Sequence, residues 1–335
     1  MNIGILGAGS WGIALTDLLS VNNHKLTVWS VDKNEIDMLK QYREHKTKLP
    51  GVILKEDVEF TTNPRVAVEN MDMLVMVVPS PYIRSTSKTI APYVKKNQLI
   101  VNVSKGIEEN TLMTLTDIIS EEIPCARVGV LSGPSHAEEV GKHLPTTVVA
   151  GAYKKEIATL IQDTFMTDYF RVYTSPDVIG IELGGALKNV IALAAGIADG
   201  LGCGDNTKAA LITRGIAEIT RLGVAMGGKV ETFAGLSGIG DLIVTCASKH
   251  SRNRNAGFLI GQGKTYKEAM AEVKMVVEGV YSAKAAMALS EEYHIEMPIV
   301  KCVNMMLFEN LPAIEAMRIL LGRDKTKEVE TLSWN

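Results

Sequence analysis

The sequence contains few cysteines and few histidines, and neither residue type is clustered. No CxxC pair and no cysteine–histidine group at zinc-ligand spacing occurs, and the six histidines show no ligand spacing either. The sequence therefore predicts no metal site and no disulfide framework. It favours buried free thiols in a reducing compartment, at Cys125, Cys203, Cys246 and Cys302.

A strong net charge and a long apolar run are also missing. The formal charge is −3, which gives no electrostatic reason to expect nucleic acid or an anionic membrane as the main partner. No stretch of about 18 uninterrupted apolar residues occurs, and no basic leader precedes the first apolar run, which starts at Met1. These absences predict a soluble, cytoplasmic protein that is not inserted into a membrane.

What is present is enough apolar sequence for two cores. The chain has 335 residues, of which 46% are hydrophobic, and this length favours two domains. Short β-branched runs alternate with helix-compatible segments up to about residue 175, and long segments rich in Ala, Leu, Met and Glu follow. We expect an α/β domain with a Rossmann-type doubly wound sheet over residues 1–175 and an all-α domain over residues 176–335. Strands are predicted at the start of the chain and at 26–31, 72–79, 99–103, 127–131 and 146–150.

The first strand runs into a glycine-rich segment of the kind that binds dinucleotides. Gly7, Gly9 and Gly12 form a GxGxxG pattern between an apolar run and a helix-compatible segment. In such a turn Gly7 permits the sharp bend, Gly9 leaves room for a pyrophosphate, and Gly12 lets the helix pack against the sheet. The backbone amides of Ser10 and Trp11 then face the phosphates at the helix N-terminus.

An acidic residue follows at the expected distance. Asp32 stands about 20 residues beyond Gly12, after the second predicted strand, where an acid binds the adenosine ribose hydroxyl. The alternative is a glycine turn without a ligand, but the strand, turn, helix and acid together favour a site for NAD or NADP.

One lysine stands out in the second half of the chain. Lys188 lies among apolar neighbours in the predicted central helix 181–201, where lost hydration lowers a lysine pKa toward the range useful for proton transfer. A lysine whose ammonium reaches water along its aliphatic stem fits the sequence equally well. The adjacent Asn189 is suited to orienting a substrate hydroxyl or to capping a turn.

Two loops of the second half carry further polar groups. Asp241 ends a second glycine-dense segment, where its carboxylate could hold the lysine, bind a hydroxyl or cap a helix. Ser251, Arg252 and Asn253 stand at the predicted start of a helix and together form a receptor for one phosphate. A solvated basic loop is the alternative for this segment.

Two loops of the first half also lie at predicted strand ends. Lys105 points into the cofactor crevice if the strand 99–103 is correct, and it is otherwise a surface lysine. The segment Ser132–Ala137 can present hydroxyls and amides to the nicotinamide side. For His136 a surface or capping position is favoured over a general base, because no acid matches it.

These motifs together resemble the NAD(P)-dependent glycerol-3-phosphate dehydrogenases of the soluble bacterial type. The resemblance extends from the first strand to about residue 298 and implies an all-α second domain like the C-terminal domain of 6-phosphogluconate dehydrogenase. It is carried by GAGSWG at 7–12, VSKGIE at 103–108, SGPSHAEEV at 132–140, ELGGALKNVIALAAGI at 182–197, GLSGIGDLIVTC at 235–246, SRNRNAG at 251–257 and VVEGV at 276–280.

The resemblance also implies roles for individual residues. Lys188 corresponds to the proton acceptor for the C2 hydroxyl of sn-glycerol 3-phosphate, and to the proton donor when dihydroxyacetone phosphate is reduced for phospholipid synthesis. The implied substrate contacts are Lys105, Gly133, Ser135, Lys188, Asp241, Ser251, Arg252 and Asn253. The cofactor contacts, from the resemblance and the residues together, are Gly7, Gly9, Ser10, Trp11, Gly12, Asp32, Lys105, Ala137, Arg252, Val276 and Glu278.

The segment after the second strand departs from the family pattern. Many members carry a basic residue or histidine there, which can receive a 2′-phosphate, whereas this chain has Val31-Asp32-Lys33. Asp32 repels that phosphate and Lys33 attracts it, so both NAD and NADP stay open, with a lean toward NAD. The apolar second domain makes a homodimer plausible.

Two other functions compete with this interpretation. The first is a different dehydrogenase of the same two-domain plan, such as a 6-phosphogluconate or 3-hydroxyacyl-CoA dehydrogenase, but the SRNRNAG loop argues against it. The second is a non-catalytic NAD(H)-sensing protein, which has no need of Lys188 or Asp241 beside the nicotinamide.

Overall fold

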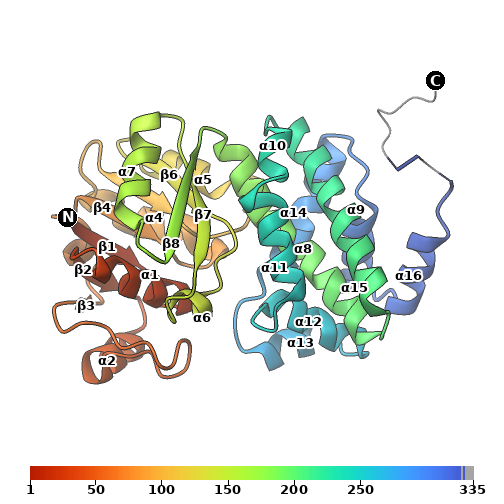
Figure 1. The fold of residues 1–335 in the computed structure, drawn as a ribbon, viewed down its shortest axis with the longest axis horizontal. Coiled ribbons are helices and arrows are strands. Elements are labelled where there is room, and N and C mark those ends of the chain that lie inside the picture. Colours follow the sequence, from red (N-terminus) through yellow and green to blue (C-terminus); the bar gives the residue numbers. More distant parts are fainter. Residues whose placement is uncertain (326, 329–335) are drawn as a thin grey trace.

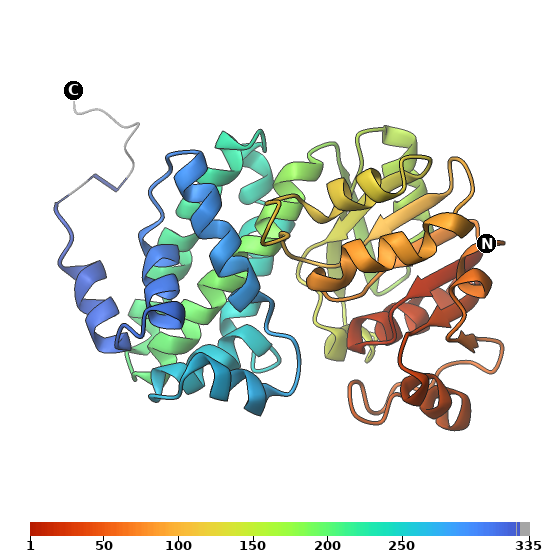
Figure 2. The ribbon, with the colours of Figure 1, turned by 180° about the vertical axis from the view of Figure 1, so that it is seen from behind.

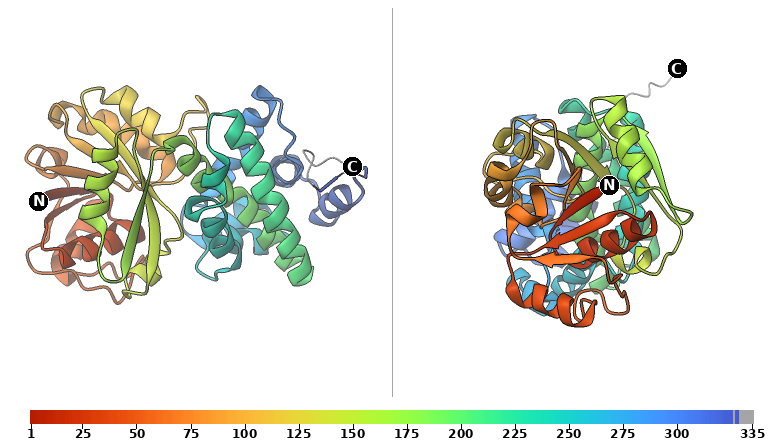
Figure 3. Two further views of the ribbon diagram at one scale, coloured as in Figure 1. Left: turned by 45° about the horizontal axis from the view of Figure 1, so that its top comes forward. Right: turned by 90° about the vertical axis from the view of Figure 1, so that its left-hand side faces the viewer.

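The structure is a computed structural model that describes residues 1–325, 327 and 328. Residues 326 and 329–335, which end the predicted second domain, lie outside the described residues. An α/β half and a helical half lie side by side along the long axis of the molecule (Figure 1). The left view in Figure 3 shows the same separation.

The α/β half is built on one eight-stranded sheet in the order β3-β2-β1-β4-β5-β6-β7-β8. The order of the first six strands is that of a dinucleotide-binding Rossmann sheet, and these six strands are parallel. Strand β7 runs antiparallel to β6, and β8 is parallel to β7. The bounds are β1 Asn2–Leu6, β2 Lys25–Trp29, β3 Glu59–Thr61, β4 Met73–Met76, β5 Leu99–Asn102, β6 Arg127–Ser132, β7 Thr146–Gly151 and β8 Phe170–Ser175.

Helices cover both faces of this sheet. In the fully buried strand β4, Met73 and Val75 pack into one core and Leu74 and Met76 into another, because successive side chains point to opposite faces. Helices α1 and α7 pack in the first core, and α4 and α5 pack in the second, on the far side of the sheet (Figure 2). The helices of this half are α1 Ser10–Val21, α2 Lys33–Tyr42, α3 Pro64–Val68, α4 Ile83–Ile90, α5 Leu115–Glu122, α6 Ala137–Val140 and α7 Lys155–Phe165.

The helical half is arranged around α8, Val178–Gly200, most of whose residues are buried. Glycines allow α12 to lie directly on α8: a Cβ on Gly196 would stand 2.0 Å from the carbonyl oxygen of Arg254, and one on Gly257 would stand 2.2 Å from that of Leu193. The other helices are α9 Gly204–Ala225, α10 Val230–Phe233, α11 Asp241–Ala247, α12 Arg252–Gly261, α13 Tyr266–Val273, α14 Glu278–Glu292, α15 Pro298–Phe308 and α16 Ala313–Leu321.

The predicted fold class is confirmed, and the differences concern single elements. Helix α2, which follows Asp32, stops at Tyr42, because Arg43 adopts a left-handed conformation with φ 56°. Strands β3 and β8 were not predicted: β3 has only three residues, and β8 alternates buried and exposed residues as an edge strand. The chain passes from β8 to α8 between Ser175 and Val178. The domain division at 175 and 176 stays a prediction.

Two helical stretches of the described residues are long and apolar enough to cross a membrane by length and composition alone. They are Val178–Gly200 and Val230–Ala247, and 94% of the most apolar 18-residue window of the first is buried inside the protein. A core helix of a protein without any membrane contact passes the same test, so this finding is weak evidence for a membrane span.

Candidate active site

A cleft of about 660 Å³ lies where the carboxyl ends of the parallel strands meet the helical half. Loops after β1, β2, β4, β5 and β6 line one side of it, and residues of α8, α11, α12 and α14 line the other. Ligands of open parallel sheets bind at this edge, where the order of the strands reverses. In this sheet the reversal falls between β1 and β4.

The glycine-rich turn after β1 has the geometry that a dinucleotide needs. Gly7 has φ +131°, and a Cβ there would stand 3.0 Å from the backbone of Val77. A Cβ on Gly12 would stand 2.1 Å from the carbonyl oxygen of Gly7, so only glycine lets α1 approach the turn this closely. Above Gly9 no atom lies within 4 Å of a Cβ position, which leaves room for a phosphate at the N-terminus of α1.

An ion-pair network of three side chains occupies the interface between the two halves. The Asp241 carboxylate accepts a hydrogen bond from Lys188 Nζ at one oxygen and from Lys105 Nζ at the other, the latter at 2.6 Å. Lys105 also donates to the carbonyl oxygen of Gly133 at 2.9 Å. Because Lys188 comes from α8, Asp241 from α11 and Lys105 from the loop after β5, this network exists only when the halves are together.

Burial sets the protonation of this network. Lys188 is only 6% exposed, so the alternative of an ammonium that reaches water does not apply. Desolvation lowers the pKa of Lys188 to about 7, although the Asp241 carboxylate favours the charged form. Burial alone would raise the pKa of Asp241, but the charges of Lys105 and Lys188 outweigh burial and lower this pKa. The site therefore holds an amine that exchanges its proton near neutral pH.

Two neighbours fix the position of the Lys188 ammonium and of the helix that carries it. Thr245 accepts a hydrogen bond from Lys188 Nζ at 2.7 Å. The Asn253 side chain donates to the side-chain oxygen Oδ1 of Asn189 at 2.9 Å and accepts from the Gly279 amide at 2.8 Å, so it connects α12 to α8 and α14. Sequence reasoning missed Thr245, although its place four residues after Asp241 puts both on one face of α11.

Two further acids of the helical half accept hydrogen bonds from the α/β half. Glu278, at the start of α14, accepts from the Ser80 amide at 3.1 Å and from the Ser80 hydroxyl. Glu182 on α8 accepts from the Thr116 amide at 2.9 Å and from the Thr116 hydroxyl. Burial raises the pKa of Glu278, and it raises that of Glu182 to about 7. These contacts fix the relative position of the two lysines.

His136 occupies the N-cap position of α6 and is partly exposed, which agrees with the surface or capping position that the sequence favoured. Its side chain makes no capping hydrogen bond to α6, and its ring lines the cleft 6.0 Å from that of His250. The Nε2 atom is buried and has no hydrogen-bond partner among the described residues. Burial and the charge of Lys188 lower the pKa of His136. His136 therefore holds the capping position without a side-chain cap, and its ring faces the cleft.

Most of the predicted site residues lie together around the cleft. The lining includes Gly7, Gly9, Ser10, Trp11, Asp32, Lys105, Ser135, Ala137, Lys188, Ser251, Arg252, Asn253, Val276 and Glu278. Three others lie behind this lining: Gly12 in the turn, Gly133 as acceptor of Lys105, and Asp241, which is 1% exposed. Ser251 caps α12 through its hydroxyl, which accepts from the Arg254 amide at 3.2 Å. The individual roles stay predictions.

Within the described residues no group of His, Cys, Asp and Glu is arranged to hold a metal ion. All four cysteines are free, with Cys246 and Cys302 buried but Cys125 exposed, so the expectation of buried thiols fails for Cys125. The molecule combines a Rossmann sheet, which has an open glycine turn, with a helical domain that carries a buried amine and a buried carboxylate. This combination defines a two-domain nicotinamide-dinucleotide dehydrogenase.

Comparison with known proteins identifies the particular family. The N-terminal model of the NAD-dependent glycerol-3-phosphate dehydrogenases matches residues 2–158, and the C-terminal model matches residues 177–318. The chain belongs to this family, as the sequence motifs predicted.

Close relatives match over the whole chain. A protein of Agathobacter rectalis named glycerol-3-phosphate dehydrogenase (NAD(P)+) is 61% identical over 332 residues, which are 99% of each chain. A protein of the same name from Fusobacterium nucleatum is 60% identical over 336 residues, and each chain is covered completely, at 100%. The crystal structure of glycerol-3-phosphate dehydrogenase from Coxiella burnetii superposes with a TM-score of 0.93 at 35% identity, over 96% of this chain and 99% of that one.

Proposed function

We propose that this protein catalyses the reversible, NAD(P)-dependent reduction of dihydroxyacetone phosphate to sn-glycerol 3-phosphate, for glycerophospholipid synthesis. The observation that carries the proposal is the buried Lys105–Asp241–Lys188 network, which borders the same cleft as the open glycine turn. Family membership and the names of the relatives support the substrate and the cofactor. The two alternatives, a different dehydrogenase of the same two-domain plan and a non-catalytic NAD(H)-sensing protein, are not favoured. The chain matches this family along nearly its whole length.

The bound nicotinamide would supply or accept the hydride at the substrate C2 carbon. As the ketone is reduced its oxygen gains negative charge, and the Lys188 ammonium stabilises that charge and donates the proton. In the reverse direction neutral Lys188 takes the proton of the C2 hydroxyl. Lys105 adds a second positive charge, and Asp241 orients both amines and offsets part of their mutual repulsion.

The substrate phosphate would bind at the N-terminus of α12. Arg252 lines the cleft there beside Ser251 and Asn253, and the helix N-terminus favours an anion. This position lets phosphate binding orient C2 without taking part in the chemistry. Gly133 and Ser135 complete the substrate site in this proposal.

The cofactor site in this proposal follows the opposite wall. The pyrophosphate lies over Gly9 and receives hydrogen bonds from the amides of Ser10 and Trp11. Asp32 lies at the adenosine ribose, and the remaining contacts come from Gly7, Gly12, Lys105, Ala137, Arg252, Val276 and Glu278. Residues 1–175 would then form the dinucleotide domain and residues 176–335 the substrate domain, since the network residues Lys188 and Asp241 both belong to the second segment.

We also propose a cytoplasmic homodimer. The four free cysteines fit a reducing compartment. Apolar side chains are exposed on α16, where Leu321 is 79% exposed, and a second copy would bury them. Light scattering of the purified protein would report twice the mass of one chain, and a monomeric mass would contradict the dimer.

The direct test is an assay of NADH and NADPH oxidation with dihydroxyacetone phosphate. We expect loss of the reduced-cofactor absorbance and formation of sn-glycerol 3-phosphate in equal amounts. Binding of NADH without any turnover would instead support a sensor. Formation of reduced cofactor from NAD+ or NADP+ only with 6-phosphogluconate or a 3-hydroxyacyl-CoA would support one of the other two-domain dehydrogenases.

A further inference from the structure

The wall of the cleft at the end of β2 contains a second, separate set of charges. Ser30, Asp32, Glu35 and Lys48 all line the cleft there. Glu35 accepts a hydrogen bond from the Ser30 hydroxyl at 2.7 Å and from Lys48 Nζ. His45 Nε2 lies 3.4 Å from the same Glu35 oxygen that Lys48 contacts. Both carboxylate oxygens of Glu35 are therefore engaged.

Glu35 stays ionised in this position. Burial alone would raise its pKa, but the hydrogen bonds from His45, Lys48 and Ser30 outweigh burial and lower the pKa of Glu35 to about 2. The side chain is 14% exposed, so its charge is screened less by solvent than that of a surface acid.

Asp32 adds a second negative charge at the same wall. Its carboxylate accepts from the Asn34 amide at 2.8 Å, which makes it the cap of α2. Its own amide donates to the Ser30 hydroxyl at 3.1 Å, and that hydroxyl donates to Glu35. Ser30 thus connects both acids at the end of β2, where dinucleotide-binding sheets hold the adenosine ribose.

Two of the cations near these acids are already paired. Lys48 contacts Glu35, and Lys33 contacts Asp37 with its side chain 79% exposed. A 2′-phosphate would bring additional negative charge of about −1.5 to −2 to a wall that carries two carboxylates. To bind that phosphate, Lys48 would have to leave Glu35. A ribose with a free 2′-hydroxyl meets no such repulsion and finds carboxylate acceptors.

We propose that Glu35, by holding Lys48 and acting with Asp32, makes this enzyme prefer NAD(H) over NADP(H). The proposal rests on the proposed function only for the identity of the cofactor. Glu35 is a specificity-determining residue in this account and takes no part in the chemistry at C2.

The test measures dissociation constants for NADH and NADPH from the change in cofactor fluorescence, with no substrate present. The unmodified protein should bind NADH at least about tenfold more tightly than NADPH, the ratio that corresponds to about 1.4 kcal/mol. In Glu35→Gln the affinity for NADPH should rise at least about tenfold, because Lys48 becomes free to contact the 2′-phosphate, while NADH affinity changes less than about twofold. Adding Lys48→Met to Glu35→Gln should remove the gain.

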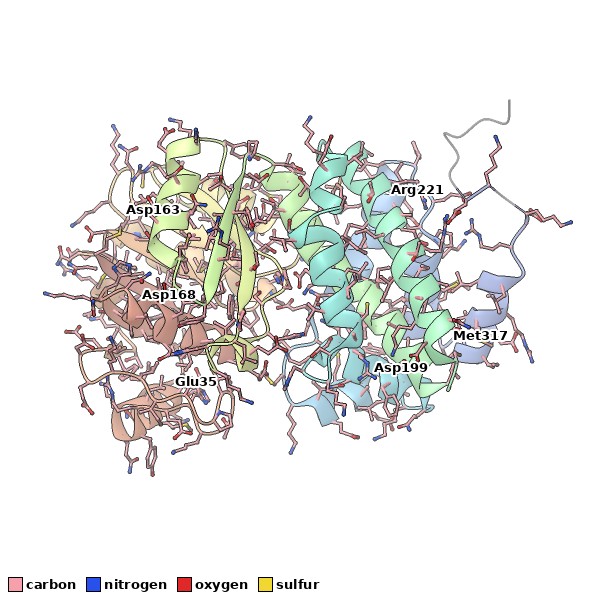
Figure 4. The ribbon with its side chains drawn as sticks, in the orientation of Figure 1. Glu35, Asp163, Asp168, Asp199, Arg221 and Met317 are labelled. Atoms are coloured by element: carbon pink, nitrogen blue, oxygen red, sulfur yellow. The ribbon has the colours of Figure 1, made fainter. Side chains whose placement is uncertain are left out.

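A matched control removes one acidic charge elsewhere on the same half. Asp163 on α7 is exposed and lies well away from Glu35 (Figure 4), so Asp163→Asn should leave both dissociation constants unchanged. Equal affinity of the unmodified protein for NADH and NADPH would overturn the proposal even if Glu35→Gln did not fold. If the gain in NADPH affinity of Glu35→Gln persisted in the double variant with Lys48→Met, the proposal would also be overturned, because the 2′-phosphate would then contact another cation. Since these are binding measurements, absence of turnover would refute the proposed function and not this inference.

Discussion

Replacing Asp241 by Asn tests how the lysine pair is controlled. The substitution keeps the shape of the side chain but removes the negative charge that contacts both Lys188 and Lys105. Two ammonium groups then remain at one buried position without a counter-charge. Because Asp241 is the main influence that favours charged Lys188, the pKa of Lys188 must fall below about 7 in the variant.

The size of the effect follows from this shift. A fall of one unit, from about 7 to about 6, lowers the ammonium fraction at pH 7.5 from about one quarter to about 3%. Ketone reduction needs the ammonium, so protonation alone reduces its rate about eightfold. Loss of the fixed ammonium position adds to this, and we expect a total decrease in kcat of about 10².

The assay is the pH dependence of kcat/KM for dihydroxyacetone phosphate reduction with saturating NADH, because this ratio reports the protonation of the enzyme before the substrate binds. In the unmodified enzyme the rate should fall as pH rises through about 7, since the acid form of Lys188 is lost. Oxidation of sn-glycerol 3-phosphate should rise over the same range. In Asp241→Asn the fall should begin at lower pH. The same profile and a kcat within twofold of the unmodified enzyme would refute the reasoning.

Two further substitutions test the phosphate site and the junction between the halves. Arg252→Ala should raise the KM for dihydroxyacetone phosphate about tenfold or more with a smaller change in kcat, because a guanidinium–phosphate contact is lost. An unchanged KM in steady-state kinetics would show that the phosphate binds elsewhere. Glu182→Ala leaves the buried amide and hydroxyl of Thr116 without their acceptor. Urea unfolding should show a loss of about 1–3 kcal/mol in the free energy of unfolding, and no loss would mean that the contact is not needed for stability. The milder Glu182→Gln, which keeps one acceptor oxygen, should lose less.

The sequence predicted those parts of the fold and site that depend on local patterns. The glycine turn, the buried parallel strands and the central helix were predicted because each has a characteristic spacing or a continuous apolar run. Lys188 and Asp241 were singled out separately, with alternatives open for both. Their contact depends on α8 and α11 packing together, 53 residues apart in sequence, and no local pattern contains that information.

The elements that were missed lack such patterns. Strand β3 has three residues, and β8 alternates buried and exposed residues. Strand β7 was predicted, but its apolar sequence does not specify that it runs antiparallel to β6. His136 was expected at the surface or at a cap, and no local pattern indicated that its ring lines the cleft near His250. Glu35 lies on α2 and Lys48 in the loop that follows it, and no local pattern in the sequence indicates that the two side chains pair.

The central claim is that Lys188 transfers the proton in the reaction, and Lys188→Ala tests it most directly. Turnover of dihydroxyacetone phosphate should fall by about 10² or more, while the dissociation constant for NADH, measured on the same preparation, stays within about twofold of the unmodified value. Turnover close to that of the unmodified enzyme, with NADH still bound, would show that another group supplies the proton.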